Sequence, residues 1–233
     1  MEHSCYFPQT RSTGYGPIRV EKEQKQYTSG FRLLKPGALI PGGQRMRIND
    51  NIVKDQELLR AASDPEALTQ LGTYNWWNGW WRSDPRNAFE KLIQLLWSDQ
   101  DLPETVAGFE YWNNVNQATG GVGWHRDCDE KLRAASGRVI SPKVGHIYYM
   151  HAENLSGGFL EISVAQNMSL IALENLERIR PQKNRVIFFD PSLLHRVSPV
   201  HAGLRHAFLA NAWDSKPGTF DLGDRVDAQF QPV

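Results

Sequence analysis

Hydrophobic residues in the first part of the chain recur at the spacing of an α-helix. In residues 51–71 the apolar positions that share one helical face are Ile52, Leu58, Leu59 and Ala62. The triplet Ser63-Asp64-Pro65 interrupts this stretch, and proline fits the first turn of a helix but not its interior. We therefore expect two short helices, one that ends at the triplet and one that begins there.

A second helical pattern occupies residues 88–97 and follows a Ser-Asp-Pro triplet at 83–85. Its apolar positions are Phe89, Leu92, Ile93, Leu96 and Trp97. Their spacing predicts a helix with one strongly hydrophobic face. A helix of this kind must bury that face, and we expect these helices to brace the outside of the main β-sheet.

From residue 109 onward the pattern changes to short apolar runs separated by turns. Residues 185–189 form an apolar run typical of a buried strand, Asp190-Pro191 follows as a turn, and residues 207–213 indicate one more strand. This alternation is typical of a sheet closed on itself or of a two-sheet sandwich.

The first 41 residues show no steady periodicity. Residues 1–30 are polar and indicate a loose N-terminal arm or an edge strand at 18–20. Residues 31–41 are broken by Pro-Gly pairs, so turns should dominate there.

Composition narrows the class of protein. The length of 233 residues suits one domain, and the 26 basic and 26 acidic residues balance without a long run of either sign. We therefore expect neither a nucleic acid nor a membrane as a partner. Cys5 and Cys128 are too few for a disulfide framework, and no stretch has the pattern of a signal peptide or a membrane span. These features predict a soluble, cytoplasmic protein, and they leave its oligomeric state open.

Candidate metal ligands stand in two separate stretches. His125 and Asp127 are two residues apart, so on an extended strand both side chains leave the same face. His195, after the 185–189 strand, can complete a set of two histidines and one carboxylate, the facial triad of non-haem Fe(II) oxygenases. By itself the His-x-Asp pattern also fits a buried histidine and a turn-forming aspartate. The downstream stretch favours the metal site.

Arg205 stands shortly after His195, at the head of the 207–213 strand. A guanidinium forms paired, charge-assisted hydrogen bonds with a carboxylate. An arginine this close to a metal site would bind a dicarboxylate.

Residues 109–213, with these motifs in this order, resemble the Fe(II)/2-oxoglutarate-dependent dioxygenases, and within them the prolyl-4-hydroxylase-like branch. Residues 145–162, with Tyr149 and Gly157-Gly158-Phe159-Leu160, resemble the intervening strands of that branch. The resemblance implies that His125, Asp127 and His195 bind iron, and that Arg205 and Tyr149 bind the far carboxylate of 2-oxoglutarate. It also implies Fe(II), 2-oxoglutarate and dioxygen as cofactors, with ascorbate as a possible supporting reductant.

The same resemblance implies the fold. We expect a mainly β protein with flanking helices, an α+β arrangement whose core is a double-stranded β-helix, also called a jelly roll or cupin-like fold. The expected layout of the single domain is an arm at 1–30, a helix-rich support region at 31–105, the catalytic core at 106–215 and a tail at 216–233.

Two positions depart from related branches. Oxygen-sensing prolyl hydroxylases carry a further tyrosine where this chain has Val115, and Tyr111 or Asn113, on the same strand face, could replace its hydrogen bond to the co-substrate. The branch that repairs methylated nucleic acids has a second arginine where this chain has Asn211. This difference again points away from nucleic acid.

Other residues keep two interpretations. Four of the eight tryptophans lie at 76–81 and could form an aromatic wall for substrate or part of the core; we favour the core. Trp124 and Arg126, beside the ligands, are candidate substrate contacts. Residues 129–143 could be a lid or a solvated loop. The histidines at 146, 151, 201 and 206 do not fit as ligands.

The resemblance implies hydroxylation of an unactivated C–H bond, because Asp127 fills the position that related halogenases leave open for chloride. The expected substrate is a prolyl or other amino-acid residue in a peptide or protein. One alternative is the same chemistry on a free amino acid or a small natural product, and desaturation or ring closure are variants of the reaction. An alternative of another class is a jelly-roll module that binds or senses metal without turnover.

Overall fold

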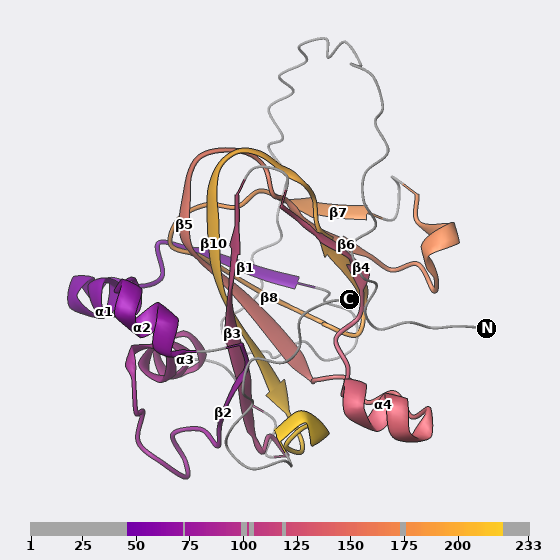
Figure 1. Ribbon diagram of the computed structural model, residues 1–233, viewed down its shortest axis with the longest axis horizontal. Helices are drawn as coiled ribbons and strands as arrows, with labels where there is room; N and C mark the ends of the chain where they lie inside the picture. The colour runs from indigo at the N-terminus through magenta and orange to yellow at the C-terminus, as the bar shows by residue number, and fades with distance from the viewer. Residues whose placement is uncertain are drawn as a thin grey trace.

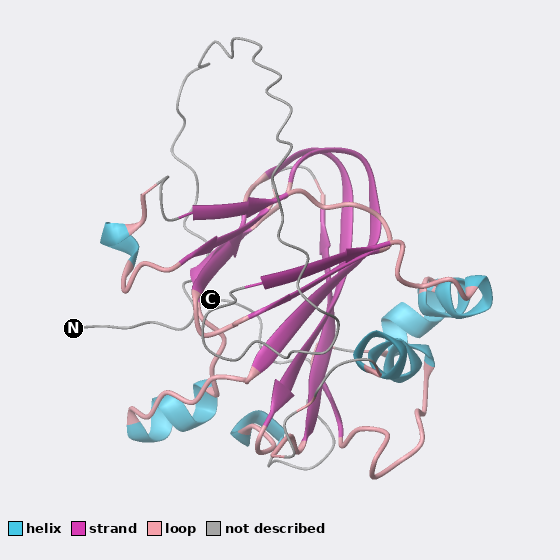
Figure 2. Cartoon of the chain, turned by 180° about the vertical axis from the view of Figure 1, so that it is seen from behind, coloured by secondary structure: helices cyan, strands magenta, loops and turns pink. Residues whose placement is uncertain are grey.

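The architecture is seen in a computed structural model, which describes residues 46–71, 73–98, 102, 105–117, 120–172 and 176–220. Two antiparallel sheets form its centre, and helices lie outside them (Figure 1, Figure 2). The larger sheet has the strand order β1 (Met46–Asp50), β8 (Arg185–Phe189), β5 (Val144–Gly157), β10 (Val200–Trp213), β3 (Gly108–Asn116) and β2 (Asn75–Trp77). The smaller sheet has the order β4 (Val122–His125), β9 (Leu194–Val197), β6 (Leu160–Ser163) and β7 (Leu176–Ile179).

The eight strands from β3 to β10 follow one simple pairing scheme. β3 pairs with β10, β4 with β9, β5 with β8 and β6 with β7, always antiparallel. This is one long hairpin rolled over, so that its successive strand pairs lie alternately in the larger and the smaller sheet. Such a roll is a double-stranded β-helix. The expected fold is therefore confirmed from the strand pairing itself.

Side chains of the larger sheet alternate between an inner face, toward the smaller sheet, and an outer face, toward the helices. The buried inner residues include Ile147, Tyr149, Ile187, Phe189 and Ala207, which pack with Leu160 and Ile162 of β6. The buried outer residues include Tyr148, Val186, Phe188, Phe208 and Ala210. Adjacent residues of one strand thus belong to two separate hydrophobic cores.

The N-terminal helices lie where the sequence predicts them. α1 (Gln56–Ala62) stops before Ser63, α2 (Pro65–Gln70) begins with proline, and α3 spans Ala88–Trp97. The side chains of Asp55, Asp64 and Asn87 accept hydrogen bonds from backbone N–H groups and cap the three helices. α3 buries its apolar face in the outer core, so the expected bracing of the sheet is confirmed.

The tryptophan cluster is mainly part of the outer core. Trp77 is 1% exposed, and Trp80 stacks on Phe109 at 5.9 Å between ring centroids. Trp81 is 41% exposed and touches the same phenylalanine. The favoured interpretation, a core role, therefore holds for Trp77 and Trp80.

Some expectations differ from the structure or fall outside it. Residues 129–143 contain a helix, α4 (Glu130–Ser136), which Asp129 caps by accepting from the N–H of Leu132. Strand β1 has no counterpart among our expectations. The predicted arm at 1–30, the edge strand at 18–20 and the turns at 31–41 lie outside the described residues, as does most of the tail.

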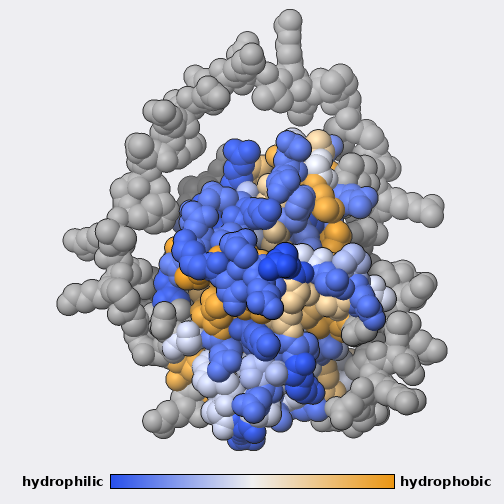
Figure 3. Space-filling view, turned by 90° about the vertical axis from the view of Figure 1, so that its left-hand side faces the viewer, coloured by the Kyte–Doolittle hydropathy of each residue, from blue (hydrophilic) through white to orange (hydrophobic). Residues whose placement is uncertain are grey.

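The surface on the side of α1 and α2 is largely hydrophilic, with smaller hydrophobic patches between the polar groups (Figure 3). Among the described helices, none combines the length and the apolar character that crossing a bilayer requires.

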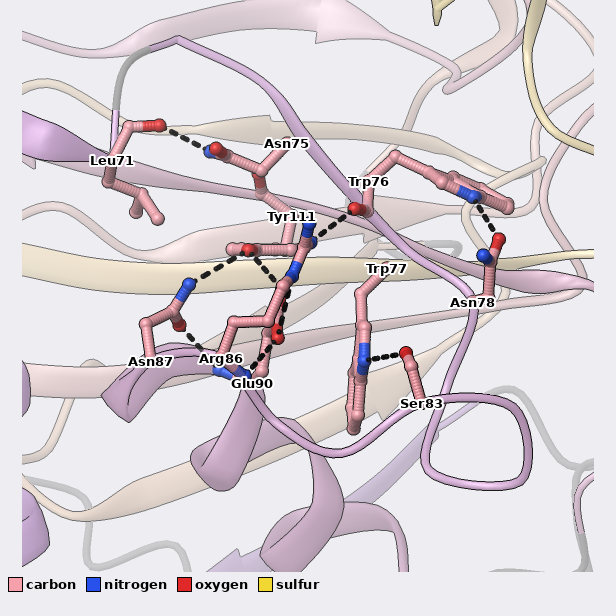
Figure 4. A network of polar contacts seen from close by, with 10 residues as sticks. All are labelled: Leu71, Asn75, Trp76, Trp77, Asn78, Ser83, Arg86, Asn87, Glu90 and Tyr111. Carbon is pink, nitrogen blue, oxygen red and sulfur yellow. Dashed lines mark hydrogen bonds and ion pairs between the residues drawn. The ribbon is translucent and has the colours of Figure 1, made fainter. Parts of the chain in front are cut away.

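A buried carboxylate joins α3 to the larger sheet (Figure 4). Glu90 is 0% exposed, and its Oε1 accepts from the hydroxyl of Tyr111 on β3 at 2.8 Å. The guanidinium of Arg86 donates to both carboxylate oxygens, and a second guanidinium nitrogen bonds to the carbonyl of Trp76 on β2. Helix and sheet are therefore held in register by charge-assisted hydrogen bonds.

Removing this carboxylate should destabilise the fold. We expect Glu90→Ala to lower the free energy of unfolding by about 2–3 kcal/mol, because buried donors lose their acceptor while Arg86 can still turn toward water. Lys91→Ala, an exposed neighbour on the same helix, should change it by less than about 0.5 kcal/mol. Urea denaturation measures both, and equal effects would contradict the role given to Glu90.

Candidate functional site

The two histidines meet because β4 and β9 pair in one particular register. His125, the last residue of β4, lies opposite His195 of β9, and their ring centroids are 4.2 Å apart. Asp127 follows β4 in a loop that is fixed by a hydrogen bond from its own N–H to the carbonyl of Pro191 at 3.0 Å. Residues far apart in the sequence are thus brought to one point by strand pairing.

The three side chains converge on that point. Oδ1 of Asp127 is 3.5 Å from Nε2 of His125 and 3.5 Å from Nε2 of His195. Nδ1 of His125 is 2.7 Å from the carbonyl of Gly123, and Nδ1 of His195 is 2.9 Å from that of Leu193. A carbonyl only accepts, so each Nδ1 carries the proton and each Nε2 presents its lone pair to the cluster.

Electrostatics keeps the cluster in a metal-binding form. Burial, followed by the neighbouring His195, lowers the pKa of His125 to about 4. Burial alone would raise the pKa of Asp127, but His195, His125 and Asn211 outweigh it and lower that pKa to about 2. At neutral pH the site therefore offers a neutral His125 imidazole and a carboxylate, the forms that coordinate a cation.

Two imidazoles and one carboxylate within 4.8 Å of one another fit a divalent iron with open positions on the far side. In the part of the chain that the structure describes, this is the one group of three or more such ligands. The other histidines of the described residues are elsewhere; His146, for instance, accepts a hydrogen bond from Trp97 in the outer core.

Arg205 lies on the inner face of the larger sheet and is 0% exposed. One of its terminal nitrogens, Nη1, donates to Oδ1 of Asn114 at 3.1 Å and of Asn116 at 3.0 Å. Its Nε and its other terminal nitrogen, Nη2, have no hydrogen-bond partner among the described residues, nor does the hydroxyl of Tyr149. The guanidinium carbon is 5.1 Å from the centroid of the Tyr149 ring.

These unpaired donors form a site for an anion. Burial raises the pKa of the Tyr149 hydroxyl, so this group keeps its proton and can donate. No carboxylate of the described residues pairs with Arg205, and a buried cation without a counter-ion is costly. A carboxylate of a ligand would satisfy the guanidinium and the hydroxyl together, which is the fit that 2-oxoglutarate requires.

Tyr111 and Asn113 do not lie in this site. The hydroxyl of Tyr111 donates to Glu90, and Oδ1 of Asn113 is 3.1 Å from Nε2 of His206 on the outer face of the sheet. The predicted contact of these two residues with the co-substrate is therefore wrong, because the strand has the opposite phase. The neighbours on the inner face, Asn114 and Asn116, hold Arg205 instead.

Trp124 and Arg126 flank the ligands without joining them. The guanidinium of Arg196 lies over the ring of Trp124 at 4.8 Å. The guanidinium of Arg126 donates to the carbonyls of Ala165 and Gln166 at 3.2 Å and 2.9 Å. Arg126 thus ties the ligand loop to the segment after β6.

A second carboxyl group, Glu110 of β3, lies near the ligands. Its Oε2 accepts from Nε1 of Trp213 at 3.0 Å. Burial, followed by the charge of Asp127, raises the pKa of Glu110 to about 8. The group is mostly protonated at neutral pH and adds little negative charge beside Asp127. Glu110 is not among the site residues predicted from the sequence, because a single acidic residue in a strand gives no signal of this kind.

Comparison with known families adds to the geometry. Residues 111–213 match the model of the 2OG-Fe(II) oxygenase superfamily. The chain carries a 2OG-Fe(II) oxygenase domain. It is a dioxygenase, and its cofactors are Fe(II), 2-oxoglutarate and dioxygen.

Several solved structures are similar to this chain at low sequence identity. A prolyl-4-hydroxylase from Pseudomonas putida has 14% identity and a TM-score of 0.46, over 73% of this chain and 88% of that one. A viral collagen prolyl hydroxylase from Paramecium Bursaria Chlorella virus-1 has 15% identity and a TM-score of 0.49, over 75% and 98%. A prolyl hydroxylase from Trichoplax adhaerens, in complex with a peptide fragment, has 16% identity and a TM-score of 0.48, over 72% and 83%. No curated protein matches the chain in sequence.

The unpaired charge of Arg205 has a measurable consequence. Without ligands, Arg205→Met should leave the free energy of unfolding unchanged or raise it by up to about 2 kcal/mol, because a buried cation without a counter-ion is lost. Arg185→Met is the matched control, since Arg185 donates to both carboxylate oxygens of Asp50 at 2.6 Å and 2.8 Å. This control should lose about 1–3 kcal/mol. Equal losses on urea denaturation would show that Arg205 is already paired.

Proposed function

We propose that this oxygenase hydroxylates an unactivated C–H bond of a prolyl or other amino-acid residue in a peptide or protein. His125, Asp127 and His195 bind the iron, and Arg205 and Tyr149 bind the far carboxylate of 2-oxoglutarate. The observation that carries the proposal is the occurrence, in one roll, of an open three-ligand cluster on the smaller sheet and buried, unpaired donors on the inner face of the larger sheet.

Each side chain has a separate task. The backbone carbonyls of Gly123 and Leu193 orient the imidazoles, so that both Nε2 atoms face Oδ1 of Asp127. Arg205 supplies charge and two unpaired donor nitrogens, Nε and Nη2, and the hydroxyl of Tyr149 supplies a third donor atom. Together the cofactors supply the oxidant for the C–H bond, while these residues bind and orient them.

The proposed co-substrate site is more deeply buried than the ligand cluster that the substrate would approach. Arg205 is 0% exposed, whereas the side chains of His125 and Asp127 are 14% and 17% exposed. The co-substrate therefore lies in the interior, and the substrate approaches at the open side of the ligand cluster.

The surroundings of that open side favour a peptide or protein. Arg126 holds the segment that leads to the exposed Met168 and Leu170, and the N–H of Asp129 donates to the carbonyl of Ile140, next to the exposed Val139. Exposed apolar side chains thus occur in both segments tethered to the ligand loop. Surfaces of this kind suit a macromolecular ligand that covers them.

The carboxylate of Asp127 favours hydroxylation as the reaction. It occupies a ligand position that a halogenase would leave to a halide. The N–H of Asp127 donates to the carbonyl of Pro191 and the amide of Asn211 donates to its carboxylate, so the side chain is held at that position.

Turnover assays test the proposal. Iron-loaded protein is mixed with 2-oxoglutarate, air and either proline-containing peptides or free amino acids, and succinate and the mass gain of one oxygen are measured. Wild type should hydroxylate peptides, His195→Ala should not, and His201→Ala, which removes an exposed histidine outside the cluster, should behave as wild type.

Two outcomes would contradict parts of the proposal. Oxidation of free amino acids or small metabolites without any peptide product would overturn the substrate class. Full turnover by His195→Ala would overturn the proposed iron site.

A further inference from the structure

The two carboxylate oxygens of Asp127 have different surroundings. Oδ1 lies 3.5 Å from Nε2 of each cluster histidine. Oδ2 accepts a hydrogen bond from Nδ2 of Asn211 at 2.9 Å. One oxygen therefore faces the point where the ligands converge, and the other is turned away from it and occupied.

Asn211 is held in place from two neighbouring strands. It lies on the inner face of β10, is 3% exposed, and pairs with Glu110 of β3 on one side and Gly145 of β5 on the other. A Cβ atom added to Gly145 would approach Oδ1 of Asn211 to 2.7 Å, so the amide would have to shift from its present position. Gly145 thus provides the space in which the amide sits.

The orientation of the amide follows from its partner. A carboxylate only accepts hydrogen bonds, so the NH₂ group of Asn211 faces Asp127 and its carbonyl oxygen faces Gly145. In the reverse orientation the amide would turn its carbonyl oxygen toward Asp127 and could not donate a hydrogen bond to the carboxylate.

We propose that Asn211 is a positioning residue that restricts Asp127 to binding iron through one oxygen. By occupying Oδ2, the amide prevents the carboxylate from turning both oxygens toward the metal, and so keeps one more position free for the co-substrate and dioxygen. Outer partners of metal ligands commonly have this orienting effect. The inference rests on the proposed role of Asp127 as an iron ligand.

Co(II) is a suitable probe, because it binds the same nitrogen and oxygen ligands and absorbs visible light. Wild type, Asn211→Leu and Leu209→Ala are titrated with Co(II) in the absence of 2-oxoglutarate. Leucine keeps the approximate size of asparagine but cannot donate, while Leu209→Ala removes packing from the same inner face without touching Asp127.

We expect Asn211→Leu to raise the dissociation constant for Co(II) about 10–100-fold, as is typical for outer partners of metal ligands. We also expect its visible d–d absorption to change, because a carboxylate that binds through both oxygens alters the ligand set and the geometry around Co(II). Leu209→Ala should keep the affinity and the spectrum of wild type.

Two results would overturn the inference. One is an unchanged affinity and spectrum in Asn211→Leu. The other is a weaker affinity with an unchanged spectrum, which would indicate a general loss of packing and not a change in how Asp127 binds.

Asp127→Ala separates this inference from the function on which it rests. If wild type and Asp127→Ala bind Co(II) equally, the proposed iron site itself is wrong. If Asp127→Ala loses binding while Asn211→Leu retains both affinity and spectrum, the iron site stands and only the role of Asn211 is rejected.

Discussion

The antiparallel pairing of β4 with β9 is the constraint on which the site depends. It places His125 directly opposite His195, and the chain on either side supplies the remaining parts: Asp127 two residues after one histidine, and a backbone carbonyl two residues before each. A slip of one residue would turn one imidazole to the opposite face of the smaller sheet. The rolled hairpin fixes this register. The strands that flank β4 and β9 along the chain also pair with one another, β3 with β10 and β5 with β8.

The alternation of side chains along β10 organises the second half of the site. Arg205, Ala207 and Asn211 face inward, while His206, Phe208 and Ala210 face the helices. One strand therefore brings the buried guanidinium of Arg205 and the amide of Asn211, which donates to Asp127, to the same interior. The buried, unpaired donors near Tyr149 cost stability in the free protein, which is the usual consequence of a preorganised binding site.

Periodic signals in the sequence predict much of this structure. α3 spans Ala88–Trp97 as its apolar spacing indicates, and the Ser63-Asp64-Pro65 triplet separates α1 from α2. Residue type and spacing make His125, Asp127 and His195 candidate ligands, the resemblance of the stretches around them implies the metal site, and the structure brings the three together. The helix signals are local, whereas the ligand set is recognised only when two separate stretches of the sequence are considered together.

The errors concern strand phase and polar partners, which the local sequence does not determine. In the run from Tyr111 to Asn116 each strand face carries one aromatic residue and at least one asparagine, so either face could point inward. Pairing with β10 and the contact with Glu90 decide which one does. Asn114, Asn116 and Asn211 acquire their roles only from partners on distant strands. The α4 helix was missed because it buries none of its residues, and therefore has no apolar face to reveal it.

An anaerobic titration of the metal-free protein with Fe(II) and 2-oxoglutarate tests the central claim most directly. The measurement is the visible charge-transfer band that forms when 2-oxoglutarate chelates Fe(II), in wild type and in His195→Ala. We predict a saturable band in wild type and none in His195→Ala. A correctly folded wild-type protein without the band, or a band of equal strength in His195→Ala, would contradict the site described.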